Sequence, residues 1–361
     1  YGDHRDLHSF PTRRSSDLVV GLLCFFQSDT SSHSYAISII ERSVIYAVVA
    51  VAMNLLNGFT GLFSLGQAGF MAIGAYVTAI LTIPVEMRDS VYYMNGIAGW
   101  LHDLHAPMVV ALLIGGLFAA AAAALIGIPI LRLKSDYLAI ATLGFAEIMR
   151  AIIQWNKVGP LTNSSNLLRQ FANFDSVLFP FIVSGICIAI IVLIINSTYG
   201  RAFKAIREDE IAAEAMGINL FRHKCLAFMI SAFFAGIGGG LYATLLGTVD
   251  PKNFLFTLTY NFLLIIVLGG MGSITGSMLG SIIVTAGLEY LRIFDEPLDL
   301  FGTAIPLFRP GFRMVMFSVL LMACVLFWRK GIMGTEEFTW QKLIDFLKNP
   351  LKRFKQKGAK L

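Results

Sequence analysis

The stretch from Gly200 to Lys224, GRAFKAIREDEIAAEAMGINLFRHK, is a polar island between two long apolar runs. In the whole chain of 361 residues, 56% are hydrophobic and only 14% are charged, and the mean hydropathy is +0.71. One soluble core could not hide this much apolar surface. We therefore expect the island to lie outside a membrane that the rest of the chain crosses.

Apolar runs follow one another along the chain with short connections. An apolar helix of ~20 residues crosses the hydrocarbon core, and lipid offers no hydrogen bonds to an open backbone. The sequence therefore predicts an all-α, polytopic integral membrane protein with about nine to ten transmembrane or re-entrant segments. The apolar runs lie at residues 19–26 (short), 36–56, 60–83, 108–131, 137–155, 177–196, 225–247, 259–271, 274–293 and 312–328.

Composition divides the chain into three parts. Residues 1–18, YGDHRDLHSFPTRRSSDL, resemble a translated adapter, so we expect them to be a non-native N-terminal scar. Residues 19–328 hold the apolar runs and form the expected membrane domain. Residues 329–361 are rich in Lys and Arg and poor in acidic residues. This composition is typical of a cytoplasmic tail near anionic lipid, and we expect no nucleic-acid partner.

Basic residues orient the connections between the runs, because they favour the cytoplasmic side. The connection at 132–134, the island and the tail are basic, whereas the connection at 84–107 is acidic. If each apolar run takes the chain to the other side of the membrane, the basic connections and the tail share the cytoplasmic side only when 259–293 is a hairpin. That hairpin would turn near residues 269–273. Its arms can cross fully or dip partway into the membrane.

Glycine clusters interrupt one apolar run in each half of the chain. Residues 58–76 read GFTGLFSLGQAGFMAIGAY, and residues 269–281 read GGMGSITGSMLGS, in which Gly272, Gly276 and Gly280 are expected on one helical face. Small residues let helices pack closely. A second interpretation is that glycine-broken segments line a transport path. The path residues that this interpretation predicts are Ser64, Gly66, Gln67, Gly269, Gly270, Gly272 and Ser273.

Two pairs of opposite charges lie inside apolar runs. Glu147 precedes Arg150 by three residues, and Glu289 precedes Arg292 by the same step, so each pair can share a helix face. Charges within the membrane point to function. We expect both pairs near segment ends or interfaces, and structural pairing and a gating role are equally open for each pair.

Catalytic and metal-binding patterns are absent from the sequence. No P-loop GxxxxGK[ST] occurs, and the histidines are dispersed. We expect no catalytic residue, no metal, no disulfide, and no cofactor bound by this chain. The cysteines stand singly in or beside apolar runs, at Cys24, Cys187, Cys225 and Cys324.

The island resembles the cytoplasmic coupling loop of permease subunits of bacterial ATP-binding-cassette (ABC) importers, in particular the M-type branched-chain amino-acid permeases. The general pattern is Glu-Ala-Ala, three further residues and Gly; here Ala212, Ala213 and Gly217 match, while Ile211 stands in place of Glu. The resemblance runs from about Ile37 to Trp328. Four more blocks carry it in order: NLLNGFTGLFSLGQAGFMAIGAY, LRLKSDYLAIATLGFAEIMR, AFMISAFFAGIGGGLYA and VLGGMGSITGSMLGS.

Helical spacing within the island also predicts local structure. Phe203, Ile206 and Glu210 fit one short amphipathic helix, with Lys204 and Glu208 four residues apart. Gly217 would end that helix in a left-handed conformation. The residues that the resemblance assigns to ATPase coupling are Arg201, Lys204, Arg207, Glu208, Glu210, Ala212, Ala213, Glu214 and Gly217.

The resemblance implies partners that the residues alone do not reveal. A second permease subunit would enclose a path for Leu, Ile or Val in the bacterial inner membrane, with the C-terminus in the cytoplasm. Two cytoplasmic ATPase subunits would use the ATP, and a periplasmic or lipid-anchored binding protein would deliver the substrate. Membrane lipid would surround the assembly.

Two other functions remain open. Importers of urea or short-chain amides share these blocks, and the external stretch VGPLTNSSNLL at 158–168 departs from the pattern usual in the family. The second alternative is an autonomous ion-coupled carrier or channel built on the glycine-broken segments. The identity of the binding protein would distinguish an importer of urea or amides from one of branched-chain amino acids. Transport by the isolated chain would favour the carrier or channel.

Overall fold

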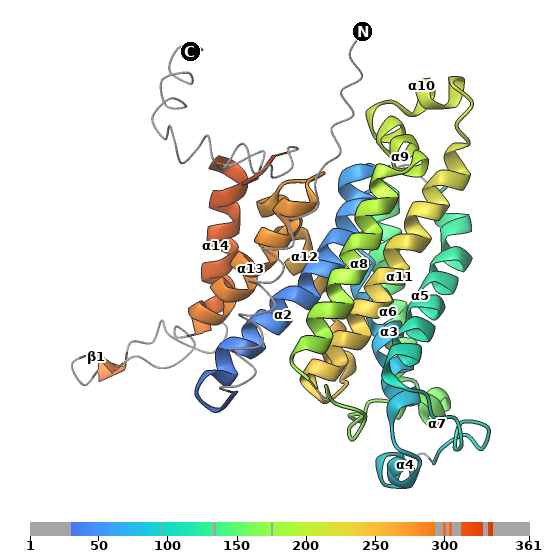
Figure 1. Cartoon of the computed structure of the whole chain (residues 1–361), viewed down its shortest axis with the longest axis vertical. Helices are drawn as coiled ribbons and strands as arrows, with labels where there is room; N and C mark the ends of the chain where they lie inside the picture. Colours follow the sequence, from blue (N-terminus) through green and yellow to red (C-terminus); the bar gives the residue numbers. More distant parts are fainter. Residues whose placement is uncertain are drawn as a thin grey trace.

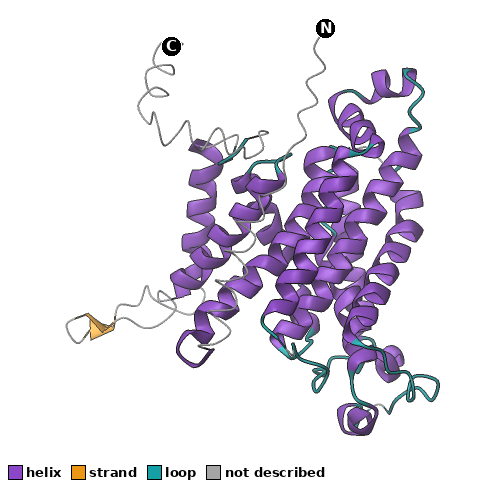
Figure 2. Ribbon diagram, in the orientation of Figure 1, coloured by secondary structure: helices purple, strands orange, loops and turns teal. Residues whose placement is uncertain are grey.

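The computed structural model describes residues 30–94, 96–132, 135–174, 176–292, 299–300, 303–304, 312–327 and 331–334. These residues form a bundle of long helices (Figures 1 and 2). The all-α class is confirmed, since the strands in the described part are only the two-residue β1 (Asp299–Leu300) and β2 (Thr303–Ala304). The expected scar and the 19–26 run lie outside the described residues, as does the tail apart from residues 331–334.

Each apolar run between residues 36 and 328 holds one main helix. The main helices are α2 (Thr30–Asn54), α3 (Gln67–Thr82), α5 (Met108–Ile130), α6 (Ser135–Gln154), α8 (Leu178–Asn196), α11 (Leu220–Leu246), α12 (Phe256–Gly269), α13 (Ile274–Tyr290) and α14 (Phe312–Phe327). The shorter helical elements are η1 (Leu55–Phe59), η2 (Val85–Met87), α4 (Arg88–Val91), η3 (Asn156–Val158), α7 (Gly159–Thr162), α9 (Thr198–Glu208), α10 (Glu210–Ala215) and η4 (Pro251–Phe254).

Helix length confirms a multi-pass membrane protein. Five helices are long and apolar enough to cross a membrane, or six if the bent pair 67–82 and 85–91 is one span. The five are the α2 helix with its η1 extension, α5, α6, α8 and α11. This number counts full-length spans only. With the shorter α3, α12, α13 and α14, the described part has nine main helices, in agreement with the nine to ten transmembrane or re-entrant segments that the sequence predicted.

Three helices, α3, α5 and α11, pack at the centre through backbone contacts at glycine. A β-carbon on Gly74 would lie 2.0 Å from the carbonyl oxygen of Gly236, and one on Gly115 would lie 2.9 Å from the carbonyl oxygen of Gly74. Side chains of any size would therefore separate these helices. Close packing at glycine is thus a structural requirement in this part of the molecule.

The α12–α13 hairpin turns at residues 270–273, close to the predicted position. Gly272 has φ +91° and lies in this turn before α13, so it does not share a helical face with Gly276 and Gly280 as expected. The latter two face α12, where their β-carbons would meet backbone atoms of Gly269 and Ile265. Four-residue spacing was misleading here because Ser273 caps the helix, accepting a hydrogen bond from the Gly276 amide.

The two ends of the bundle carry different connections. In Figure 1, α9 and α10 lie at one end, and α4 and α7 lie at the other. At the α4 end, the fully buried side chain of Arg88 gathers the connecting loops by donating to backbone carbonyls. These carbonyls belong to Ile80, Ile83, Leu101, His102 and Leu104.

Candidate functional site

The polar island folds into two helices where the sequence predicted one. Its chain becomes extended at Asp209 (φ −158°, ψ 112°), between α9 and α10. The Asp209 carboxylate accepts hydrogen bonds from the amides of Ile211 (2.8 Å) and Ala212 (3.1 Å). An aspartate that accepts hydrogen bonds from two free amides stabilises the start of a new helix. At Asp209 this start is favoured over continuation of α9. The prediction of one helix through Glu210 was therefore wrong.

The first helix, α9, buries the face that its sequence predicts. Phe203 and Ile206 are buried against the bundle. The expected pairing of Lys204 with Glu208 is replaced by other contacts: Lys204 Nζ lies 5.6 Å from the centre of the Phe59 ring, and Glu208 forms an ion pair with Arg207 at 2.5 Å. The basic side chains of α9 thus reach toward the end of α2.

The second helix, α10, ends at Gly217, which has φ +85°. The amide of Ile218 donates to the carbonyl of Ala213 (3.1 Å), and the amide of Gly217 donates to that of Glu214 (2.9 Å). These two bonds make a Schellman motif, so the expected left-handed helix end is confirmed. An ion pair of 2.6 Å between Lys224 and Glu210 then joins α10 to α11.

The polar loop also exposes two apolar residues that the sequence analysis did not assign to coupling. Ile211 and Met216 are 82% and 84% exposed, more than any other large apolar side chain in the described part of the chain. Among the predicted residues, Ala213 is buried. The others are exposed: Arg201, Lys204, Arg207, Glu208, Glu210, Ala212, Glu214 and Gly217. A charged helix with two protruding apolar side chains is suited to an apolar groove on a partner.

Beneath the loop, residues 55–66 interrupt the regular helix between α2 and α3: they form the π-helical η1 and a non-helical stretch. Arg207 contacts this α2–α3 break. Its guanidinium Nη1 donates to the carbonyl of Gly58 at 2.8 Å. A β-carbon on Gly61 (φ +75°) would lie 2.9 Å from Arg207 Cγ, and one on Gly272 would lie 3.1 Å from Nη1. The side chain therefore touches both the break and the α12–α13 turn.

Two asparagines hold the break in place, and sequence reasoning missed both. Asn54 donates to the Ser273 carbonyl (2.9 Å) and to Ser277 Oγ (2.8 Å), and it accepts from the Gly272 amide (2.9 Å). Asn57 exchanges hydrogen bonds with the backbone of Ser64. An Asn in an apolar run next to an Asn-Gly pair was the available signal.

The predicted path residues gather around this break. Gly66 donates its amide to Ser64 Oγ (3.4 Å), and Gln67 Nε2 donates to Ser231 Oγ (2.7 Å). Residues 269–273 reach the same place through Asn54. The structure thus brings the two predicted groups close together, but Ser64, Gln67 and Ser273 are buried and packed. Their role in transport stays a prediction.

The two charge pairs differ in their surroundings. Arg150 Nε and Nη2 contact Glu147 Oε2 at 2.8 and 2.7 Å. Glu147 lies seven residues and Arg150 four residues before the end of α6, ~10 Å and ~6 Å along the axis. Arg292 pairs with Glu289 at 3.1 Å close to the end of α13, as expected. Glu289 also accepts from the Tyr35 hydroxyl at 2.6 Å, which joins α13 to α2.

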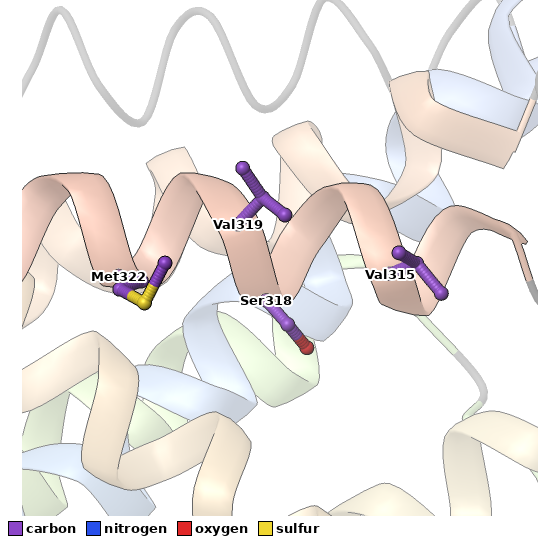
Figure 3. A pocket seen from close by; sticks show the side chains of 4 residues that line it. All are labelled: Val315, Ser318, Val319 and Met322. Carbon is purple, nitrogen blue, oxygen red and sulfur yellow. The ribbon is translucent and has the colours of Figure 1, made fainter.

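Other possible sites carry little chemistry. In the described residues, no three His, Cys, Asp or Glu side chains could hold a metal ion. Cys187 and Cys225 are free, and the side chains of Cys24 and Cys324 lie outside the described part. A hollow of about 360 Å³ beside α14 has no charged group among its described lining residues (Figure 3). It is lined by Val315, Ser318, Val319 and Met322.

The helical bundle, the two-helix polar loop and the broken α2–α3 segment together define a class, the multi-pass transport permeases. The chain belongs to the family described as the permease component of the branched-chain amino acid transport system, whose pattern matches residues 35–326. No solved structure matches the chain.

Among its relatives is the high-affinity branched-chain amino acid transport system permease protein LivM of Escherichia coli (strain K12). It is 36% identical over 294 residues, which are 72% of this chain and 64% of LivM. The chain thus spans less than two thirds of that relative's length. LivH of the same organism is 25% identical over 253 residues, 66% of this chain and 79% of LivH. A probable LivM of Methanocaldococcus jannaschii is 23% identical over 310 residues, 79% of this chain and 89% of the relative.

Proposed function

We propose that the chain is the membrane-spanning subunit of an ATP-driven importer of branched-chain amino acids in the bacterial inner membrane. One observation carries the coupling part of this proposal: α10 and its C-cap residue display Ile211 and Met216 on a charged surface outside the long apolar helices. Such a short helix fits a groove on a cytoplasmic ATPase subunit. The substrate class is supported by the family of the chain and by the printed names of its relatives.

The contacts of Arg207 supply a route from the ATPase to the membrane segments. ATP closes a pair of ATPase subunits, and helices docked on them move with them. Because Arg207 holds the carbonyl of Gly58, displacement of α9 acts directly on the α2–α3 break. Asn54 extends the contact to the α12–α13 turn. ATP binding then shifts the population between inward-open and outward-open states.

The proposed assembly has a second permease, two ATPase subunits and a binding protein outside the membrane. LivM and LivH are both named as permeases of one transport system in the same organism, and both resemble this chain. Residues 331–334, after α14, support a cytoplasmic tail: the amide of Ile332 donates to the Leu268 carbonyl (2.8 Å), beside the turn that Arg207 contacts. If α10 meets a cytoplasmic ATPase, residues 331–334 lie on the same side.

Uptake in cells tests the proposal. The chain is expressed with its accompanying second permease, ATPases and binding protein in a bacterium that lacks its own leucine importers, and entry of radiolabelled leucine is measured. We expect ATP-dependent uptake that isoleucine and valine inhibit and urea does not. Omission of the ATPases is the control. Leucine uptake without the ATPases would contradict the proposal, and ATP-dependent entry of urea in place of leucine would change the substrate.

A further inference from the structure

We propose that the outward face of α6 is the surface on which the second permease subunit packs. This inference rests on the proposed function, because it assumes that a second permease exists. The helix α6 packs mainly against α3. Its opposite face is exposed from Tyr137 to Ile152. That face consists of Tyr137, Ile140, Gly144, Ile148 and Ile152.

Charge argues that this face does not meet lipid. The ion pair of Glu147 and Arg150 lies beside the exposed face, with 31% and 27% of these side chains accessible. Intramembrane charges face protein or an aqueous cavity because lipid cannot solvate them. The pairing is also incomplete, since both Arg150 nitrogens contact Oε2, and Glu147 Oε1 is buried without a hydrogen-bond partner in the described part of the chain.

Two other long helices that each expose one face, α5 and α8, provide the contrast. Neither α5 nor α8 contains a charged residue. Both expose continuous rows of large apolar side chains, such as Leu117 and Leu125 on α5, and Ile186 and Leu193 on α8. These two helices have the composition expected of a lipid-facing surface. Among the three, α6 alone combines an apolar face with an ion pair at membrane depth.

Gly144 favours a protein partner over an aqueous channel. It lies near the middle of α6, and a β-carbon placed on it would have no heavy atom within 4 Å. An outward glycine lets another helix approach its backbone closely. The surrounding Ile140 and Ile148 are apolar, so water is a poor occupant. A second permease related to this chain, as LivH is, would offer a similar fold for packing in a quasi-twofold arrangement.

The first test compares two matched glycine variants in the complete importer. Gly144→Leu and Gly185→Leu each place a large side chain in open space, the first on α6 and the second on α8. We expect Gly144→Leu to reduce the amount of second permease that purifies with the tagged chain by about tenfold. Gly185→Leu should leave it at the wild-type amount. Equal recovery with the two variants would overturn the inference.

A second measurement avoids dependence on folding of the variants. A photo-crosslinking amino acid replaces Ile148 on α6 or Ile186 on α8, both of which are exposed. Illumination of native membranes should link Ile148 to the second permease and Ile186 to lipid. Lipid adducts at Ile148, in a complex that still contains the second permease, would show that the α6 face does not pack on that subunit. The proposed function would remain. Absence of any second permease from the wild-type complex would overturn the proposed function itself.

Discussion

Single residues decide the shape of the polar loop. Asp209 starts α10 by capping it, and Gly217 ends α10 by adopting φ +85°. Between them the helix is only six residues long. A helix this short has little stability of its own. Its orientation therefore depends on these two ends and on the Arg207 contact beneath it.

Replacement of Gly217 by valine tests the loop end. No atom lies within 4 Å of a β-carbon at this position, so the substitution strains only the backbone, by ~1–2 kcal/mol. We expect leucine uptake to fall while ATP hydrolysis continues and the amount of chain in the membrane stays unchanged. Gly217→Asn is the control, because asparagine tolerates this conformation. Leucine uptake at the wild-type rate by Gly217→Val would contradict a role of this residue in coupling.

Replacement of Arg207 by methionine tests the contact with the break. This change keeps an apolar stem and removes the hydrogen bond to the Gly58 carbonyl. We predict fewer leucine molecules transported per ATP hydrolysed, measured in proteoliposomes with the whole importer. Arg222→Met at the start of α11 is the control, since Arg222 is exposed and is not one of the predicted coupling residues. An equal ratio in the two variants would show that the Arg207 contact does not transmit motion.

At the scale of elements, glycine lets the central helices touch. The β-carbon of any other residue at Gly74 would collide with the backbone of α11 at Gly236. Overpacking of this kind forces helices apart at a cost of ~1–3 kcal/mol. The three-helix core of α3, α5 and α11 positions the start of α3 beside the break. Packing in the core therefore supports the candidate site at a distance.

Leucine at Gly74 should destabilise the protein. We expect a lower midpoint of thermal unfolding in detergent and less chain in the membrane, because α3 can no longer contact α11. Gly287→Leu on α13 is the matched control, since open space surrounds that glycine. Equal thermal midpoints for the two variants would mean that this helix contact is not needed for stability.

Leucine at Asn54 tests the link between the break and the hairpin. The change removes two donors and one acceptor in a fully buried place and leaves the Gly272 amide unsatisfied. Each unsatisfied buried group costs ~1–3 kcal/mol. We predict faster hydrogen exchange in residues 270–277 by mass spectrometry, with little change in α5. Unchanged exchange in the turn would contradict this link.

Sequence predicted the helices better than their contacts. Apolar runs located every main helix, because a membrane segment needs continuous apolar composition. Helix ends depended on single side chains, so Asp209 divided a predicted helix and Ser273 separated Gly272 from α13. The partners of Asn54 lie more than 200 residues away. Spacing along one helix contains no information about such contacts.

At the scale of the whole molecule, the features of the candidate site lie at one end of the bundle. The α9–α10 loop, the α2–α3 break and the α12–α13 turn meet around Arg207, and the segment after α14 joins the turn. The opposite end is held by the buried Arg88. This asymmetry fits a subunit that receives ATPase motion at one side of the membrane and substrate at the other.

The most direct test of this account is recovery of the ATPase subunits with the tagged chain from solubilised membranes. The test variant is Ile211→Asp with Met216→Asp, which removes the two protruding apolar side chains of α10. The control is Met94→Asp, an exposed methionine at the opposite end of the bundle. We predict that wild type and control retain the ATPase and that the double variant loses it. Equal recovery by all three, or no ATPase with the wild type, would contradict the account.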